Sequence, residues 1–224
     1  MNEDPLALQR ALIEAGDALA ASGLVAGAAG NLSARRASGR VVCTPSGSSV
    51  AGLGLGQLVT LDPGGRPLRA DQRPSSEVGA HLAIYAAAPG ALAVVHAHPV
   101  AATALGMSRD LPDLCVTAEG AATIGLLARV PYLRPGLAPL AQACGRAAAL
   151  GARAILMRHH GAICWGASLD EALGRMLALE HVARIVRAAP DAPRLTPEEV
   201  AALREGAGLP GAGGVACVEV TEQA

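Results

Sequence analysis

The sequence predicts a single α/β domain in which helices pack around a mixed or mostly antiparallel sheet. Its 224 residues fit one domain and can bury a full core without disulfides. Short β-rich runs are grouped early in the chain, with helical patterns before and after them. No internal repeat or long low-complexity block divides the chain. We therefore expect one domain over residues 1–205 and a Gly-rich tail over residues 206–224.

The first elements are predicted from caps and spacing. Asp4 and Pro5 have the form of an N-cap followed by proline at the first helical position, and leucines at helical spacing extend this helix to about Ser22. A Gly-rich break at residues 27–31 ends the helical pattern. Short β-rich runs separated by Gly-rich turns then predict strands at 31–36, 41–44 and 57–61.

The later elements alternate between helices and strands. Ser168 and Glu171 have the spacing of a capping box, which predicts the start of a long helix, and Gly151 ends an earlier one. The expected helices are 75–87, 139–150, 168–188 and one that starts at 196. The expected strands are 91–96, 129–133, 153–157, 161–165 and a short one at 215–220.

Composition excludes several classes of function. The formal net charge of −1 and the three aromatic residues provide neither a basic footprint nor a base-stacking platform, so no nucleic-acid partner is expected. All 18 basic residues are arginine. Because the chain has no lysine, Schiff-base chemistry is excluded, and any carbonyl chemistry must use a metal or another electrophile.

Cysteine usage and the N-terminal sequence bear on location. The five cysteines are scattered and form no C-x-x-C motif, which is typical of a reducing compartment, and no secretory signal is recognisable. Residues 78–108 lack charged side chains other than histidine, but Pro89, Gly90 and Pro99 interrupt them, so helix, turn and strand are favoured over a membrane span. We expect a cytoplasmic protein without a membrane partner.

Four of the six histidines fall in two short segments. His96 and His98 end an apolar strand, and alternate residues of a strand point to the same face. Two hydrogen-bonded core histidines would explain this pair alone. The later Arg158–Gly161 segment, with two more histidines, instead favours a third imidazole ligand. Three neutral nitrogens suit a divalent transition metal, most often zinc, with one position open for substrate or water.

Three short segments suit an anion. Glu77 follows two serines at a helix start, where free backbone N–H groups favour phosphate. On local sequence alone, Glu77 would be a helix cap worth roughly 0.3–1 kcal/mol. The turns at 30–31 and 46–47 have the same small residues and exposed amides. With a three-histidine metal, these segments would bind a phosphorylated substrate chelated through its oxygens.

Five motifs occur together in a recognisable order: Gly30–Ser33, Thr44–Gly47, Ser75–Glu77, His96–His98 and His159–Gly161. In this order and spacing the chain resembles the class II aldolase/adducin family over roughly residues 5–190. The resemblance implies a three-layer α/β/α domain with a mainly antiparallel sheet. It also implies a homotetramer with sites at subunit interfaces.

The resemblance assigns roles to individual residues. His96, His98 and His160 would bind one zinc ion per subunit, with Co²⁺ or Mn²⁺ as substitutes, and His159 would be a structural neighbour. Glu77 would shuttle the proton and complete the resting metal shell. The phosphate would be held by Asn31, Ser46, Gly47, Ser75 and Ser76.

The implied reaction is a zinc-dependent aldol cleavage. A ketose 1-phosphate similar to L-fuculose 1-phosphate would break its C3–C4 bond to give dihydroxyacetone phosphate and an aldehyde, because a metal stabilises the enediolate left behind. Glu77 would move the proton, a task favoured by a raised carboxyl pKa in a closed pocket.

Two positions depart from the aldolase pattern, and a third residue is a candidate substitute. Ala28 replaces a hydroxyl residue, so one phosphate hydrogen bond is lost, and Val116 aligns with the tyrosine of a neighbouring subunit. Glu119 is either a second acid/base in place of that tyrosine or a surface cap. A methylthioribulose-1-phosphate-type dehydratase and a keto-acid phosphate decarboxylase are therefore alternatives, and residues 130–136 resemble a loop of the latter. A non-catalytic adducin-like interaction module would have lost the metal histidines, which this chain keeps.

Overall fold

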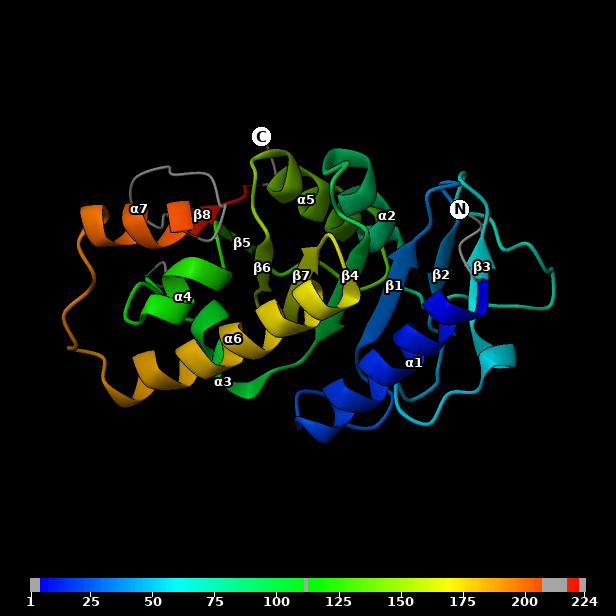
Figure 1. Cartoon of the computed structure of the whole chain (residues 1–224), viewed down its shortest axis with the longest axis horizontal. Helices are drawn as coiled ribbons and strands as arrows, with labels where there is room; N and C mark the ends of the chain where they lie inside the picture. Colours follow the sequence, from blue (N-terminus) through cyan, green and yellow to red (C-terminus); the bar gives the residue numbers. More distant parts are fainter. Residues whose placement is uncertain (1–4, 111–112, 207–216, 222–224) are drawn as a thin grey trace.

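The computed structural model describes residues 5–110, 113–206 and 217–221. Within these residues, one sheet lies between two layers of helices, and its strand order is β3-β2-β1-β4-β7-β6-β5-β8 (Figure 1). The strands are β1 Asn31–Arg35, β2 Val41–Cys43, β3 Val59–Leu61, β4 Ala93–Ala97, β5 Leu127–Val130, β6 Ala154–Met157, β7 Gly161–Gly166 and β8 Cys217–Glu219. The helices are α1 Pro5–Ala21, α2 Val78–Ala87, α3 Val100–Gly106, α4 Ala118–Thr123, α5 Ala138–Ala149, α6 Leu169–Ala188 and α7 Pro197–Gly206.

The sheet is mixed and mainly antiparallel, as the sequence predicts. β5 runs parallel to both β6 and β8, whereas the other described pairings are antiparallel. β8 lies in the stretch expected to be a tail and extends the sheet beside β5. The Gly-rich residues 207–216, and the Asp4 cap expected for α1, fall outside the described residues.

Each face of the sheet packs on its own helical layer. Consecutive strand residues divide between the two cores: Val94 and Ile155 belong to one, and Val95 and Leu156 to the other. The first core lies under α2 and α5, and the second under α1, α3 and α6, which lie on the near face in Figure 1. Because both faces are covered, the central strands are apolar without alternation. Close packing on both faces holds β4 and β7, and therefore their ends, in place.

Most expected elements occur within a few residues of their predicted bounds, but α3, α4 and the short 3₁₀ turn Leu55–Gln57 were not predicted. α3 follows Pro99, which provides no side-chain cap, so its sequence lacks a start signal. The strand expected at 129–133 is Leu127–Val130. Pro131 follows it directly, and proline has no N–H to continue a ladder.

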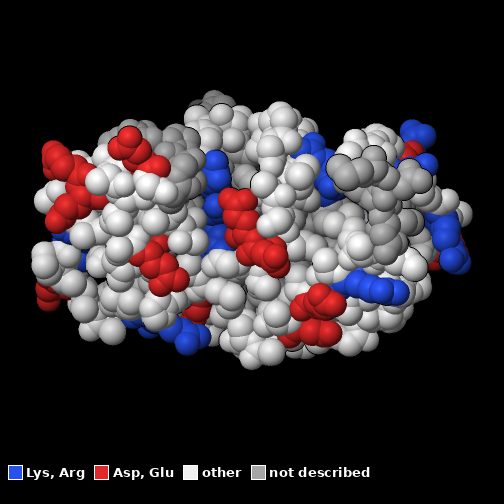
Figure 2. Space-filling model, viewed as in Figure 1, with Lys and Arg blue, Asp and Glu red and all other residues white. Residues whose placement is uncertain are grey.

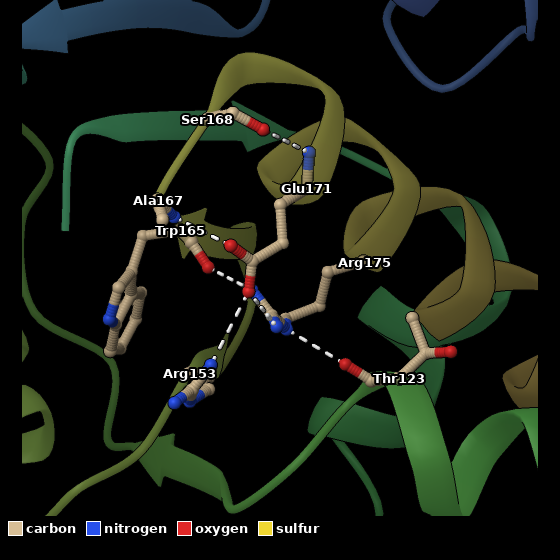
Figure 3. A network of polar contacts seen from close by, with 7 residues as sticks. All are labelled: Thr123, Arg153, Trp165, Ala167, Ser168, Glu171 and Arg175. Atoms are coloured by element: carbon tan, nitrogen blue, oxygen red, sulfur yellow. Dashed lines mark hydrogen bonds and ion pairs between the residues drawn. The ribbon is translucent and has the colours of Figure 1, made fainter. Parts of the chain in front are cut away.

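A polar network fastens α6 to the end of β7 (Figure 3). The carboxylate of Glu171 accepts from Arg175 at 2.8 Å and from Arg153 at 3.3 Å. Arg175 also donates to the Thr123 carbonyl at 2.9 Å and to the Trp165 carbonyl. The network therefore joins β7, α4 and α6, together with Arg153 just before β6.

Charged side chains of both signs lie on the surface (Figure 2), and the cysteines are buried. Acidic and basic side chains both occur on the face shown in Figure 2, and most of that face is neutral. All five cysteines lie in the described part of the chain, buried and without a disulfide. No helix in that part is long and apolar enough to cross a membrane.

Candidate metal centre and active site

Two adjacent strands bring three histidines together. His96 is fully buried on β4 and pairs in register with Asn31 of β1 and with Ile163 of β7. His98 follows the end of β4, and His160 directly precedes β7. One ligand atom from each of the three imidazoles lies within 4.8 Å of the other two. The grouping predicted from the two sequence clusters is therefore formed.

Glycines let the backbone approach these histidines closely. A Cβ atom at Gly161 would lie 2.4 Å from the Ala97 carbonyl oxygen and 2.7 Å from the His98 ring. Gly30 has a φ of +79°, and a Cβ there would lie 2.8 Å from the His96 carbonyl oxygen. Both positions therefore require glycine on steric grounds, so the G-N and H-G pairs of the motifs serve to pack the site.

Glu77 points into the histidine group from the start of α2. It is the N-cap residue by position, but its side chain makes no capping hydrogen bond. Its Oε2 lies 2.9 Å from His96 Nε2 and its Oε1 lies 3.1 Å from His160 Nε2, and the Asn31 amide donates to Oε2 at 3.2 Å. The helix-capping alternative for Glu77 is therefore wrong.

The donor set fits a metal cation. A carbonyl oxygen can only accept, so His96 Nδ1, 2.9 Å from the Ala162 carbonyl, carries a hydrogen. When this ring is neutral, its Nε2 presents a lone pair toward His98 Nε2 at 3.1 Å and toward the Glu77 carboxylate at 2.9 Å. A divalent ion among these atoms relieves their repulsion, and three imidazoles with one carboxylate suit zinc and its neighbours. The Ala162 contact would be the outer bond that orients His96 as a metal ligand.

The charges of the site also favour a cation. Burial, together with the neighbouring His96 and His160, lowers the pKa of His98 to about 4, so its ring is neutral at pH 7. Burial acts to raise the pKa of Glu77, but contacts with His160 and His96 outweigh it and hold the pKa well below its usual range. The raised pKa expected for Glu77 is therefore wrong, because a positive charge among the imidazoles, carried by a proton or by a metal ion, favours the ionised carboxylate.

Three anion-friendly loops surround the same cavity, which has a volume of about 340 Å³. Two of them are tied together: Ser46 N donates to the Arg73 carbonyl at 3.0 Å, and Ser75 N donates to the Thr44 carbonyl at 3.1 Å. All five residues predicted to hold phosphate line the cavity, beside Ala28, Glu77, His98 and His160: Asn31, Ser46, Gly47, Ser75 and Ser76.

Two features of the site were not expected from the sequence. Pro135 lines the cavity, and it belongs to the loop 130–136. Behind the metal group, His81 is buried one turn after Glu77 on α2, with its Nδ1 2.7 Å from the Ser33 hydroxyl, which lies 2.8 Å from the Tyr85 hydroxyl. The spacing of Glu77, His81 and Tyr85 by four residues is a helical-face signal that could have revealed this group.

Other candidate residues lie away from the cavity. Glu119 is exposed in the first turn of α4 and does not line the cavity of its own chain. Val116 is partly buried against the core. His159 is exposed, with its ring 6.3 Å from that of Tyr132, and it has a φ of +56°, which lets the next residue turn inward. The structure thus separates His159 from the three grouped histidines.

Comparison with known proteins identifies the family. Residues 10–186 match the model of the class II aldolase and adducin N-terminal domain. The chain belongs to this family, as its motifs indicate, and the fold is the one expected.

Similar proteins within the family are enzymes. The chain is 37% identical over 188 residues to a 3-oxo-tetronate 4-phosphate decarboxylase of Escherichia coli K12, covering 81% of this chain and 88% of the relative. It is 33% identical over 182 residues to a methylthioribulose-1-phosphate dehydratase of Acidiphilium cryptum, covering 77% and 86%. A solved L-fuculose 1-phosphate aldolase superposes with a TM-score of 0.81 at 28% identity, covering 92% and 97%.

Proposed function

We propose that this protein is a metal-dependent lyase that acts on a small phosphorylated keto compound. The observation that carries the proposal is one cavity lined by Glu77, His98, His160 and three loops rich in neutral hydrogen-bond donors. His96, His98 and His160 would hold one divalent ion per chain, with zinc first and Co²⁺ or Mn²⁺ as substitutes. The same loops would hold the phosphate through backbone amides and hydroxyls.

The reaction we favour is decarboxylation of a phosphorylated 3-oxo acid. It is supported by 37% identity to a decarboxylase of this kind and by the loop 130–136, whose Pro135 reaches the cavity. The aldolase reaction was the first expectation from the sequence, and the comparisons support the decarboxylase and dehydratase alternatives better. Ala28, which removes a hydroxyl from the cavity, is consistent with this departure from the aldolase pattern.

The chemistry assigns separate tasks to the residues. In a 3-oxo acid, the bond to the carboxylate breaks, CO₂ leaves, and the electron pair flows toward the ketone, giving an enediolate when C2 carries a hydroxyl. The bound divalent ion would supply a Lewis acid for the ketone oxygen. Glu77, held by Asn31 beside the imidazoles, would relay to C2 a proton taken from solvent water. Decarboxylation and aldol cleavage would both end at the enediolate of dihydroxyacetone phosphate, so the same Glu77 serves either.

A dehydratase of the methylthioribulose-1-phosphate type is the second candidate, supported by the relatives at about one third identity. Elimination of water requires one group to remove a proton and another to protonate the leaving hydroxyl. Glu119 is outside the cavity of its own chain, so it would reach the substrate only from another subunit. We propose this role for Glu119 together with the homotetramer. An interaction module without catalysis is disfavoured, because the complete histidine group is kept.

One assay separates these reactions. Zinc-loaded protein is incubated with a 3-oxo-tetronate 4-phosphate, a methylthioribulose 1-phosphate and L-fuculose 1-phosphate, and CO₂, dehydrated product and dihydroxyacetone phosphate are measured. We expect CO₂ and dihydroxyacetone phosphate in equal amounts from the first substrate. Dehydrated product from the second or aldehyde from the third, without CO₂ from the first, would overturn the decarboxylase assignment.

A further inference from the structure

Helix α3 begins directly after a metal-site histidine and takes its cap from a distant helix. The N-cap residue Pro99 has no side-chain oxygen to satisfy the first amides of α3. Glu180 of α6 does so instead: its Oε2 accepts from Ala101 N at 2.9 Å and from Ala102 N at 3.0 Å. The side chain of Glu180 is only 4% exposed. A buried carboxylate thus replaces the missing local cap.

The environment of Glu180 is specific to this task. Its second oxygen lies 3.2 Å from Ala101 N and accepts from Arg184 Nε at 2.8 Å, and the Arg184 side chain is 62% exposed. The buried charge is therefore balanced by one guanidinium and by the positive end of α3. Glu180 does not line the cavity, so it does not contact a substrate bound there.

The chain between β4 and α3 is short, and it carries His98. On one side, β4 is fixed in the middle of the sheet. His98 N itself donates to the Leu24 carbonyl at 3.0 Å, and α3 follows after Pro99. Glu77 contacts His96 and His160 directly through its carboxylate, whereas the ring of His98 has one described hydrogen-bond contact, with His96, and meets the His160 ring only edge to face at 5.1 Å. The direction of His98 therefore depends on where its backbone is held.

We propose that Glu180 is a positioning residue for His98, which it holds by capping α3. The inference rests on the proposed metal centre. It states that the orientation of the ligand His98 depends on the buried carboxylate of Glu180, 82 positions later in the chain. Without the carboxylate, α3 would lose its only described cap and its first turn would loosen. His98 would then sample more orientations and bind the ion less tightly, because metal affinity depends on outer groups that orient the ligands.

The test uses Glu180→Gln, which keeps the size of the side chain but loses the charge that two amides share. Co²⁺ is titrated into the full-length apoprotein, and its visible absorption reports ligand geometry independently of catalysis. We expect the dissociation constant to rise about tenfold or more, within the roughly 10–100-fold known for outer-shell partners, and the spectrum to change. Glu171→Gln is the matched control, because it removes a hydrogen-bonded carboxylate from the same helix. It should leave the Co²⁺ dissociation constant and the spectrum unchanged.

A second variant separates positioning from loss of fold. Adding Pro99→Ser to Glu180→Gln supplies a local hydroxyl cap to α3, so the wild-type spectrum and affinity should largely return. Circular dichroism checks that each variant is folded. Wild-type affinity and spectrum in folded Glu180→Gln, or no recovery in the double variant, would overturn the inference while leaving the metal centre intact. Failure of the wild type to bind Co²⁺ would overturn both.

Discussion

Two carboxylates lie at opposite ends of β7, and their partners differ. Glu77 meets His160, which precedes the strand, and Glu171 lies in α6 just after it. Glu77 is surrounded by imidazoles and one amide, and its side chain is 13% exposed. Glu171 is held by two guanidinium groups, and its side chain is 35% exposed. A carboxylate thus occurs both in the proposed metal centre, at Glu77, and in the structural network that joins α6 to β7, at Glu171.

The difference is chemical rather than geometric. Arginine keeps its proton at any ordinary pH and offers only donors, so the Glu171 network is neutralised without further groups. A neutral imidazole offers a lone pair, so Glu77 and its histidines present several lone pairs to one point. A divalent cation would accept the lone pairs around Glu77, whereas the arginine donors around Glu171 would repel it. Partners, and not burial alone, therefore distinguish the carboxylate of the proposed metal centre from the structural one.

The largest effect should follow removal of the metal or of one ligand. A strong chelator should abolish activity, and Zn²⁺, Co²⁺ or Mn²⁺ should restore it. His160→Ala should lose more metal affinity than the roughly 10–100-fold that an outer partner costs, and added metal at ordinary concentrations should not rescue it. Metal analysis after gel filtration measures this, and full zinc occupancy in His160→Ala would show that the cluster is not the site.

Glu77→Gln should be the next most damaging change. It keeps the size of the side chain and the contact with Asn31, but it removes the group that carries the proton. We expect kcat to fall on the order of 10²–10⁴-fold, the usual range for general acid–base catalysis, while thermal stability changes little. Comparable turnover by this variant and the wild type would assign the proton transfer to another group.

Ser75→Ala tests the phosphate loops. The Ser75 hydroxyl accepts from Glu77 N at 3.3 Å, which leaves its own hydrogen free to bind an anion in the cavity. Losing a hydrogen bond to a charged group should cost about 1.5–3 kcal/mol in kcat/KM for the phosphorylated substrate. An unphosphorylated analogue should be nearly unaffected. Equal losses on both substrates would mean that Ser75 supports Glu77 and does not bind phosphate.

The smallest effect is expected in the structural network around Glu171. Glu171→Gln should lower the free energy of unfolding by about 1 kcal/mol, reduced by its partial exposure, and leave metal binding intact. Partial burial acts to raise the pKa of Glu171, but the hydrogen bonds from Arg175 and Ala167 N lower it. Because a lowered pKa stabilises the fold only above the unfolded value, the difference from wild type should vanish as the pH falls below about 4. Chemical unfolding at pH 7 and at lower pH measures this, and a difference that grows with acid would contradict it.

The fold was largely predictable because its signals are local. The cap at Ser168, the break at Gly151 and the strand-ending prolines each act within a few residues. α4 also has a local cap, because the Thr117 hydroxyl accepts from Gly120 N at 3.0 Å, and that signal was overlooked. α3 was missed for the opposite reason. α3 depends on Glu180, whose contact with Ala101 spans 79 positions of sequence, and no window around Pro99 contains that information.

The site was predictable wherever periodicity and motif coincided. The spacing of His96 and His98 on a strand and the later histidine pair predicted a three-histidine group, and the family resemblance then assigned His160, not His159, to it. The pKa direction of Glu77 was not, because it depends on which side chains meet across β1, β4 and β7. The same holds for the group of Ser33, His81 and Tyr85, which forms only when α2 packs on β1.

Calorimetric titration of the apoprotein with Zn²⁺ tests the central distinction between the two carboxylates most directly. The wild type and Glu171→Gln should each bind one ion per chain with the same affinity, and His96→Ala should bind none at comparable concentrations. This result would show that the cation site belongs to the imidazole-lined carboxylate. Unchanged binding by His96→Ala, or loss of binding in folded Glu171→Gln, would contradict the account.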